Sequence, residues 1–122
     1  MKGKLKMNVN IDEEDFLEIL MNQLKQWTDD ETALSLFRDK YERDIEDGIF
    51  ESNNMTVAQI VNNDWLNWCE VIYKKDNKRL YNRLMKLIEE GRWDVSGEDW
   101  SKYNYSPNLI EAYNDDAVLI RI

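Results

Sequence analysis

The sequence has no histidine and a single cysteine, Cys69, among its 122 residues. A structural zinc site needs four cysteine or histidine ligands, so one chain of this composition cannot form one. Catalytic pairs in which histidine serves as the base are excluded for the same reason. An intramolecular disulfide needs two cysteines, which argues against a disulfide-stabilised secreted domain. Cys69 follows Trp68 in an apolar stretch, where a buried, unreactive thiol is expected.

Glycine, proline and long apolar runs are also scarce. Four glycines and one proline exclude collagen-like or low-complexity character. No segment approaches the roughly 18 apolar residues of a membrane-spanning helix, and acidic residues follow the N-terminal lysines where a signal peptide would have its apolar core. We therefore expect a cytoplasmic protein with no membrane association. The length and a hydrophobic fraction of 43% predict a single domain over residues 1–122.

Alternating and helical apolar spacings predict an α+β fold. Residues 5–11 alternate as a short strand, and 109–113 and 117–122 flank a turn signal at 114–116, which indicates a C-terminal antiparallel hairpin. Apolar residues at helical spacing predict four to five helices between these strands. We therefore expect the helices to pack with a small antiparallel sheet, made of the hairpin and, as an option, the N-terminal strand.

The helix boundaries follow from capping residues. Asp12 is expected to cap the first helix, and Thr28 the second, with Glu31 closing a capping box. Thr56 is expected to cap a third helix, whose apolar face extends to Ile72 unless the residues at 62–64 break it. The second helix should end at Gly48 and the last at Gly91, after a polar connection at 74–78. The expected inner stripe of the second helix is Leu34, Phe37, Tyr41 and Ile45.

Charge is distributed unevenly along the chain. The chain has 25 acidic and 16 basic residues, a net charge of −9, and residues 10–51 alone contribute −10. Some of these charges form pairs of opposite sign spaced i,i+4, such as Arg38–Glu42 and Lys40–Asp44. Such pairs are typical of a solvent-exposed helix face, and we expect this face to account for part of the charge. The remaining carboxylates cluster around helix starts, so antiparallel packing of the first two helices would align them in a negative ridge. Such a ridge repels nucleic acid, since binding a phosphate backbone requires cations.

Other patterns select no chemistry. The segment 74–86 is basic with interleaved tyrosines, and is either a nucleic-acid patch, which the net charge disfavours, or a self-association surface complementary to the acidic helices. The run 44–48 departs from a calcium loop because its glycine is misplaced and Met55 stands at the closing glutamate position. Carboxylate pairs for acid–base catalysis are not distinguished from the other acids. The aromatic loop at 92–106 either covers the core or anchors a partner.

Three stretches carry a resemblance: WTDD at 27–30, the segment 41–48, and IVNNDW at 60–65. Together they resemble small acidic proteins of phages and mobile elements of Gram-positive bacteria, over about residues 12–72. This resemblance implies a bacterial host cell. It also implies a relation to anti-restriction and anti-CRISPR inhibitors, several of which mimic nucleic acid. It includes no catalytic motif, so it assigns no functional residue.

The sequence therefore leads to one hypothesis and one alternative. The hypothesis is a non-enzymatic inhibitor, without cofactor or metal, whose acidic helices bind the basic nucleic-acid-binding groove of another protein. The protein itself does not contact nucleic acid, and both monomer and homodimer remain open. The alternative is a general interaction or assembly module that uses the aromatic loop. The predicted partner-binding residues are Asp12, Glu13, Glu14, Asp29, Asp30, Glu31, Glu46 and Asp47, with Trp93 and Trp100 as anchors.

Overall fold

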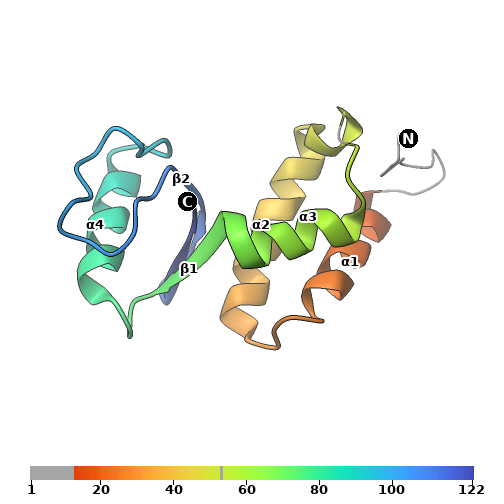
Figure 1. The fold of residues 1–122 in the computed structure, drawn as a ribbon, viewed down its shortest axis with the longest axis horizontal. Coiled ribbons are helices and arrows are strands. Elements are labelled where there is room, and N and C mark those ends of the chain that lie inside the picture. Colours follow the sequence, from red (N-terminus) through yellow and green to blue (C-terminus); the bar gives the residue numbers. More distant parts are fainter. Residues whose placement is uncertain (1–12, 53) are drawn as a thin grey trace. The chain divides into compact units, whose positions relative to one another are not determined.

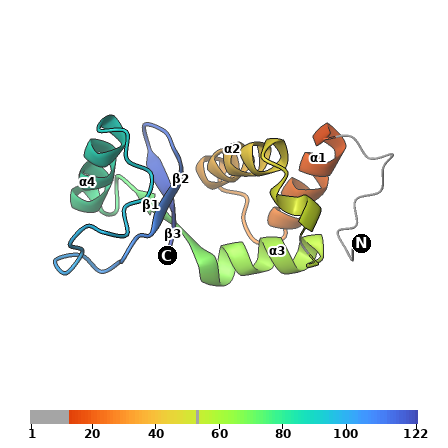
Figure 2. The same cartoon turned by 90° about the horizontal axis from the view of Figure 1, so that it is seen from above.

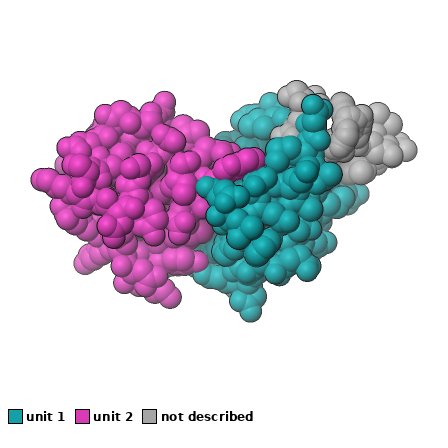
Figure 3. Space-filling model, viewed as in Figure 1, with its two compact units in different colours: residues 1–67 teal, residues 68–122 magenta. Residues whose placement is uncertain are grey.

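The computed structural model describes residues 13–52 and 54–122 (Figure 1). The chain forms two compact units, Met1–Asn67 (unit 1) and Trp68–Ile122 (unit 2) (Figure 3). The expected strand at 5–11 and the Asp12 cap lie outside the described residues, and the single domain stays a prediction. The α+β class is confirmed, with four α-helices and a three-stranded antiparallel sheet in the described part of the chain. No described helix is long and apolar enough to cross a membrane.

Unit 1 is helical. Phe16, Leu20 and Leu24 on α1 are buried as the sequence predicts, and the Phe16 ring packs edge-on against Phe50 at 5.2 Å between centroids. Apolar residues of α2 and α3 complete this core. The elements are α1 (Glu13–Leu24), α2 (Glu31–Glu46), a 3-10 turn η1 (Ile49–Ser52), α3 (Val57–Asn63) and a π-helix η2 (Asp64–Trp68), which crosses into unit 2.

The N-cap of α2 is Asp30, so the prediction of a Thr28 cap is wrong. The Asp30 carboxylate accepts a hydrogen bond from the Thr32 amide at 3.0 Å. The Thr28 hydroxyl instead accepts one from the Asp30 amide at 3.1 Å, which fixes a turn before the helix. Asp and Thr are both favoured N-cap residues. Here Thr28 binds the backbone of the turn and Asp30 caps the helix, so the helix begins two residues later than expected. At the other end, Gly48 ends the helix as predicted, with φ 73°.

The inner stripe of α2 is only partly the predicted one. Phe37 and Tyr41 are buried, but Leu34 and Ile45 are half-buried. The buried stripe is Ala33, Leu36, Phe37, Lys40, Tyr41 and Asp44. These residues are spaced so that they share one helical face. Because Lys40 and Asp44 are charged, a search for apolar residues at helical spacing does not find this face.

Lys40 and Asp44 form a buried ion pair, with 2.6 Å between Nζ and Oδ2. The i,i+4 pairing is as predicted, but its assignment to a solvated face is wrong. Buried charges are tolerated when they are paired, and the position of both residues on the inner stripe places them inside.

The predicted helical face through Ile72 is wrong beyond residue 68. Thr56 caps α3 as predicted, in a capping box with Gln59. The chain then continues through the π-helix into a strand, β1 (Cys69–Tyr73), which the sequence reading missed. Asp64 does not cap a new α-helix: its backbone is helical and it is the first residue of the π-helix. Its buried carboxylate accepts a hydrogen bond from the Tyr41 hydroxyl at 2.7 Å.

Unit 2 is a sheet with one helix against it (Figure 2). The strands β2 (Leu109–Tyr113) and β3 (Ala117–Arg121) form the predicted hairpin, and β1 pairs with the free side of β3, in the order β1-β3-β2. Helix α4 (Lys78–Glu89) is capped by Asn77, and its C-terminal stop is Gly91, with φ 79°. The core between helix and sheet includes Leu80, Leu84, Leu87, Ile72, Ile110, Val118 and Ile120.

Candidate functional site: the acidic surface of helices α1 and α2

The two units differ in charge. Residues 1–67 hold 15 acidic and 7 basic residues, a net charge of −8, whereas residues 68–122 hold 10 and 9, a net charge of −1. Most carboxylates of unit 1 lie on α1, on α2 and in the segment that joins them. A candidate site that depends on negative charge therefore belongs to these two helices.

Helices α1 and α2 lie side by side and run in opposite directions (Figure 1). Glu18 of α1 pairs with Arg38, in the first half of α2. Glu14, one turn earlier on α1, lies near Ile45 and Glu46, in the last turns of α2. The antiparallel packing, on which the idea of an acidic ridge depended, is therefore present.

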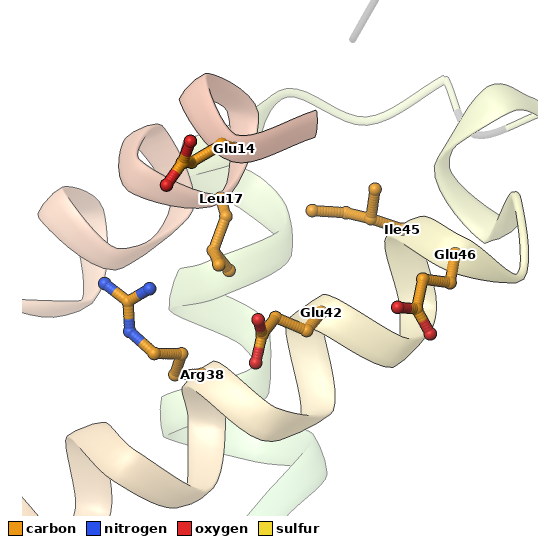
Figure 4. Close-up of a pocket in the computed structure, with 6 residues that line it drawn as sticks. All are labelled: Glu14, Leu17, Arg38, Glu42, Ile45 and Glu46. Atoms are coloured by element: carbon orange, nitrogen blue, oxygen red, sulfur yellow. The ribbon is translucent and has the colours of Figure 1, made fainter. Parts of the chain in front are cut away.

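A pocket of about 250 Å³ lies between the two helices. Figure 4 shows Leu17 of α1 and Ile45 of α2 pointing into the space between the helices, with the carboxylates of Glu14, Glu42 and Glu46 around it. Arg38 completes the lining. Positions 38, 42, 45 and 46 share one face of α2 because they are spaced by whole helical turns. We call the surface formed by Glu14, Glu42 and Glu46 around this pocket the acidic surface.

Arg38 does not neutralise the acidic surface. Its guanidinium is 2.7 Å from a carboxylate oxygen of Glu18, and this hydrogen bond, together with the positive charge of Arg38, lowers the pKa of Glu18. Among the described residues, Glu14, Glu42 and Glu46 have neither a hydrogen bond nor an ion pair. The carboxylates of Glu14, Glu42 and Glu46 thus face one pocket, and Arg38, the one cation in the lining of this pocket, is paired with Glu18 instead.

The structure brings together only some of the predicted site residues. Glu14 and Glu46 line the pocket, and exposed Asp47 follows Glu46 as the C-cap of α2. Asp29, Asp30 and Glu31 are exposed but lie at the other end of α2, about 24 Å away by the rise of a 16-residue helix. Asp12 and the side chain of Glu13 lie outside the described part of the chain.

Glu42 is the residue that sequence reasoning missed. Its i,i+4 spacing suggested a pair with Arg38, but Arg38 binds Glu18 on the neighbouring helix instead. The spacing of Glu42 from Glu46, also four residues, was the available signal for a shared face. Which of two carboxylates receives the arginine depends on how the helices pack, so the sequence could not decide it.

The two predicted aromatic anchors differ in exposure. Trp100 is 7% exposed and belongs to the core of unit 2, where its indole nitrogen donates a hydrogen bond to the Val95 carbonyl at 2.9 Å. Trp93 is 41% exposed, and its ring lies 5.7 Å from that of Tyr113. Trp100 therefore covers the core, and only Trp93 presents its ring to solvent.

Ion pairs hold the loop at 92–106 against α4. Glu98 pairs with Arg83 of α4 and, at 2.6 Å, with Arg92. Arg79 of the same helix lies over the Tyr103 ring, 5.1 Å from its centroid. Arg79 and Arg83 of the basic segment therefore have structural contacts within unit 2.

Glu70 on β1 is a carboxyl group in an apolar setting. It pairs in the sheet with Ile120 and lies on the same side of β1 as Ile72, and both isoleucines belong to the core against α4. Burial raises the pKa of Glu70, because the charged form loses hydration. The folded state therefore binds the proton more tightly than the unfolded state does.

We expect Glu70→Gln to increase the free energy of unfolding at pH 7. The stabilising effect of protonated Glu70 is complete below the pKa of an unfolded glutamate and is lost as pH rises through the higher folded pKa. The two proteins should therefore have similar stability near pH 4 and diverge above it. Urea unfolding followed by circular dichroism across this pH range measures the difference, and a variant less stable than the parent at pH 7 would contradict it.

Comparisons with protein-family models, curated proteins and solved structures found no match to this chain. Function must therefore be inferred from the residues themselves. Within residues 13–52 and 54–122, no group of three histidine, cysteine or acidic side chains is arranged to hold a metal ion. The acidic surface on α1 and α2 is the arrangement with the clearest chemical preference, which is for cations.

Proposed function

We propose that the protein is a non-enzymatic inhibitor whose acidic surface binds the basic, nucleic-acid-binding groove of another protein. The observation that carries this proposal is the pocket at which Glu14, Glu42 and Glu46 meet without a cation of their own. A groove that binds nucleic acid must present lysine and arginine to phosphates. The same side chains are attracted to carboxylates held on a rigid support.

The chemistry of the pocket suits long cationic side chains. Leu17 and Ile45 provide apolar walls, and the carboxylates surround them. Lysine and arginine bury their aliphatic stems against apolar surface while the charged head stays at a polar edge. Because the three glutamates stand on helices that are packed together, binding requires no ordering of the backbone, and the entropic cost is limited to the rotamers of the side chains.

Occupation of the groove would exclude nucleic acid from it. This mode of action is that of an anti-restriction or anti-CRISPR type of inhibitor in a bacterial host cell, which is the class that the sequence resemblance implies. The proposal requires no cofactor and no contact between this chain and nucleic acid.

A second candidate function rests on Trp93. Its exposed ring beside Tyr113 has the character of an interface anchor, since tryptophan and tyrosine are enriched at binding hot spots. In that case the protein is an interaction module, and its binding should respond to changes at Trp93 and not to changes at the acidic surface.

A competition experiment tests the inhibitor proposal. The full chain is immobilised, a nuclease-treated bacterial lysate is passed over it, and bound proteins are eluted with duplex DNA, with RNA or with polyglutamate at equal charge. We expect a nucleic-acid-binding protein that its own nucleic acid releases more effectively than polyglutamate does. A captured protein that holds this chain and nucleic acid at the same time would refute the proposed mimicry.

A further inference from the structure

The residues that precede α1 carry a cluster of positive charge. Residues 1–9 contain no acidic residue, in a chain whose net charge is −9, and they hold three lysines at alternate positions, Lys2, Lys4 and Lys6. We call residues 2–6 the N-terminal lysine segment. The structure describes the chain from Glu13 onward, so this segment lies outside the described residues. It is joined to α1, one of the two helices that form the acidic surface.

The other cations of unit 1 do not serve the acidic surface. Unit 1 contains seven basic residues, and three of them belong to the N-terminal lysine segment. Arg38 and Lys40 are paired with carboxylates outside the acidic surface, and Arg43 has a contact of its own. Lys25 follows the last residue of α1, at the opposite end of that helix from Glu14. The N-terminal lysine segment therefore holds the remaining cations of unit 1.

The lysines of this segment match the glutamates of the acidic surface in spacing. Side chains at alternate positions of an extended chain lie on one side, about 6.6 Å apart, and the sequence predicts such a chain at residues 5–11. Glu42 and Glu46 lie on one face of α2, one helical turn and about 6 Å apart. Two neighbouring lysines therefore correspond to these two carboxylates in both spacing and sign.

The segment is attached close to the pocket. Lys6 is seven residues before Glu13, a separation that an extended chain stretches to about 23 Å, and Glu14 already lines the pocket. This length allows the chain to turn back across the space between α1 and α2. A tether this short keeps the lysines at an effective concentration in the millimolar range. Contacts that would be negligible between separate molecules are therefore populated within one chain.

We propose that the N-terminal lysine segment docks on the acidic surface of its own chain and competes there with a cationic partner. Its ammonium groups pair with the three carboxylates, and the aliphatic stems of its lysines lie against Leu17 and Ile45, which point into the pocket (Figure 4). A partner must displace this occupant, so its apparent affinity is reduced to the fraction of molecules in which the surface is free. The docking stands by itself, whereas competition with a nucleic-acid-binding protein rests on the proposed function.

Two variants of the full chain with equal net charge test the proposal. The test variant replaces each lysine of the segment by glutamine: Lys2→Gln, Lys4→Gln and Lys6→Gln. The control variant removes the same charge from exposed lysines of unit 2: Lys78→Gln, Lys86→Gln and Lys102→Gln. Any difference between the two variants therefore reports the position of the lysines and not the net charge.

NMR chemical shifts measure the docking. Relative to the parent, the test variant should shift the methyl signals of Leu17 and Ile45 and the amide signals of residues 42–46, and the control variant should leave them in place. High salt should move the signals of the parent toward those of the test variant, because salt screens exposed charge pairs. Unchanged signals would refute the docking. Shifts confined to residues 13–16 would also refute it, because the lysines would then pair with the carboxylates nearest in sequence.

Titration with hexalysine, followed by the same signals, measures the competition. The test variant should bind this probe about threefold more tightly or better than the control variant does, because its acidic surface is no longer occupied. Adding Glu42→Gln and Glu46→Gln to both variants should remove the difference. Equal affinities of the test and control variants would refute the competition. Neither measurement uses a captured partner, so the inhibitor proposal fails separately, when no nucleic-acid-binding protein is retained from the lysate.

Discussion

Replacing Trp100 with alanine is expected to lower the free energy of unfolding by about 3–5 kcal/mol, the range for removal of a buried aromatic side chain. Trp100 is 7% exposed, and its ring packs edge-on against that of Tyr103 at 5.6 Å between centroids. Its indole N–H donates a hydrogen bond to the Val95 carbonyl. Removal of the indole leaves a cavity in unit 2 and takes away one of the two hydrogen bonds that the Val95 carbonyl accepts, the other coming from the Glu98 amide at 3.2 Å. Urea unfolding followed by far-UV circular dichroism measures the loss without depending on tryptophan fluorescence.

Trp93→Ala is the matched control for Trp100. Trp93 is 41% exposed, against 7% for Trp100, and its ring lies 5.7 Å from that of Tyr113, so we expect a smaller loss of about 1 kcal/mol, the range of an aromatic pair. Equal losses for the two variants would contradict the assignment of Trp100 to the core and of Trp93 to the surface. If partner binding responds to Trp93→Ala while stability hardly changes, the aromatic interaction module becomes the better account of function.

Reversal of the acidic surface by Glu14→Lys, Glu42→Lys and Glu46→Lys together is expected to weaken binding to a basic partner by about 100-fold or more. Each reversal replaces an attraction by a repulsion, and exposed charge pairs contribute up to about 1 kcal/mol each. The loss should appear mainly in the association rate and diminish as salt rises, because exposed charges are screened. Surface plasmon resonance with the captured partner, at several salt concentrations, measures both quantities.

A second triple variant separates the acidic surface from net charge. Glu89→Lys, Glu90→Lys and Asp115→Lys change the net charge by the same amount, but these exposed residues lie in unit 2. We expect this variant to bind the partner with affinity close to that of the parent. If both triple variants lose affinity equally, the partner responds to net charge and not to the acidic surface. If both bind normally, the carboxylates of the acidic surface contribute to solubility and not to binding.

The choice of residues in this test follows from the structure. Asp29, Asp30 and Glu31 were equally good candidates from sequence, but the Asp30 carboxylate caps α2. Reversing Asp30 would remove that cap, at about 1 kcal/mol, and would mix a folding effect with a binding effect. Glu14, Glu42 and Glu46 make no such contacts among the described residues, so their reversal tests charge alone.

Local sequence determined the elements whose signals are local. The C-terminal hairpin, α1, the Thr56 cap and the glycine stops at Gly48 and Gly91 all follow from periodicity, capping residues and turn residues within a few positions of one another. The uneven charge is likewise a property of the sequence, and it concentrates negative charge in residues 10–51, which include α1 and α2. These features depend on interactions between near neighbours, so they need no knowledge of the fold.

Tertiary structure decided whatever depends on distant partners. Cys69–Tyr73 becomes a strand because β3 supplies a pairing edge almost 50 residues later, and the apolar spacing before it fits a helix equally well. The ion pair of Lys40 and Asp44 is buried because helix packing turns both inward. Arg38 binds Glu18 in place of Glu42 because the packing of α1 against α2 brings the Glu18 carboxylate to 2.7 Å from its guanidinium, and this pairing leaves the carboxylates of the acidic surface without a cation. Pairing across the fold depends on three-dimensional distances, which a local pattern does not contain.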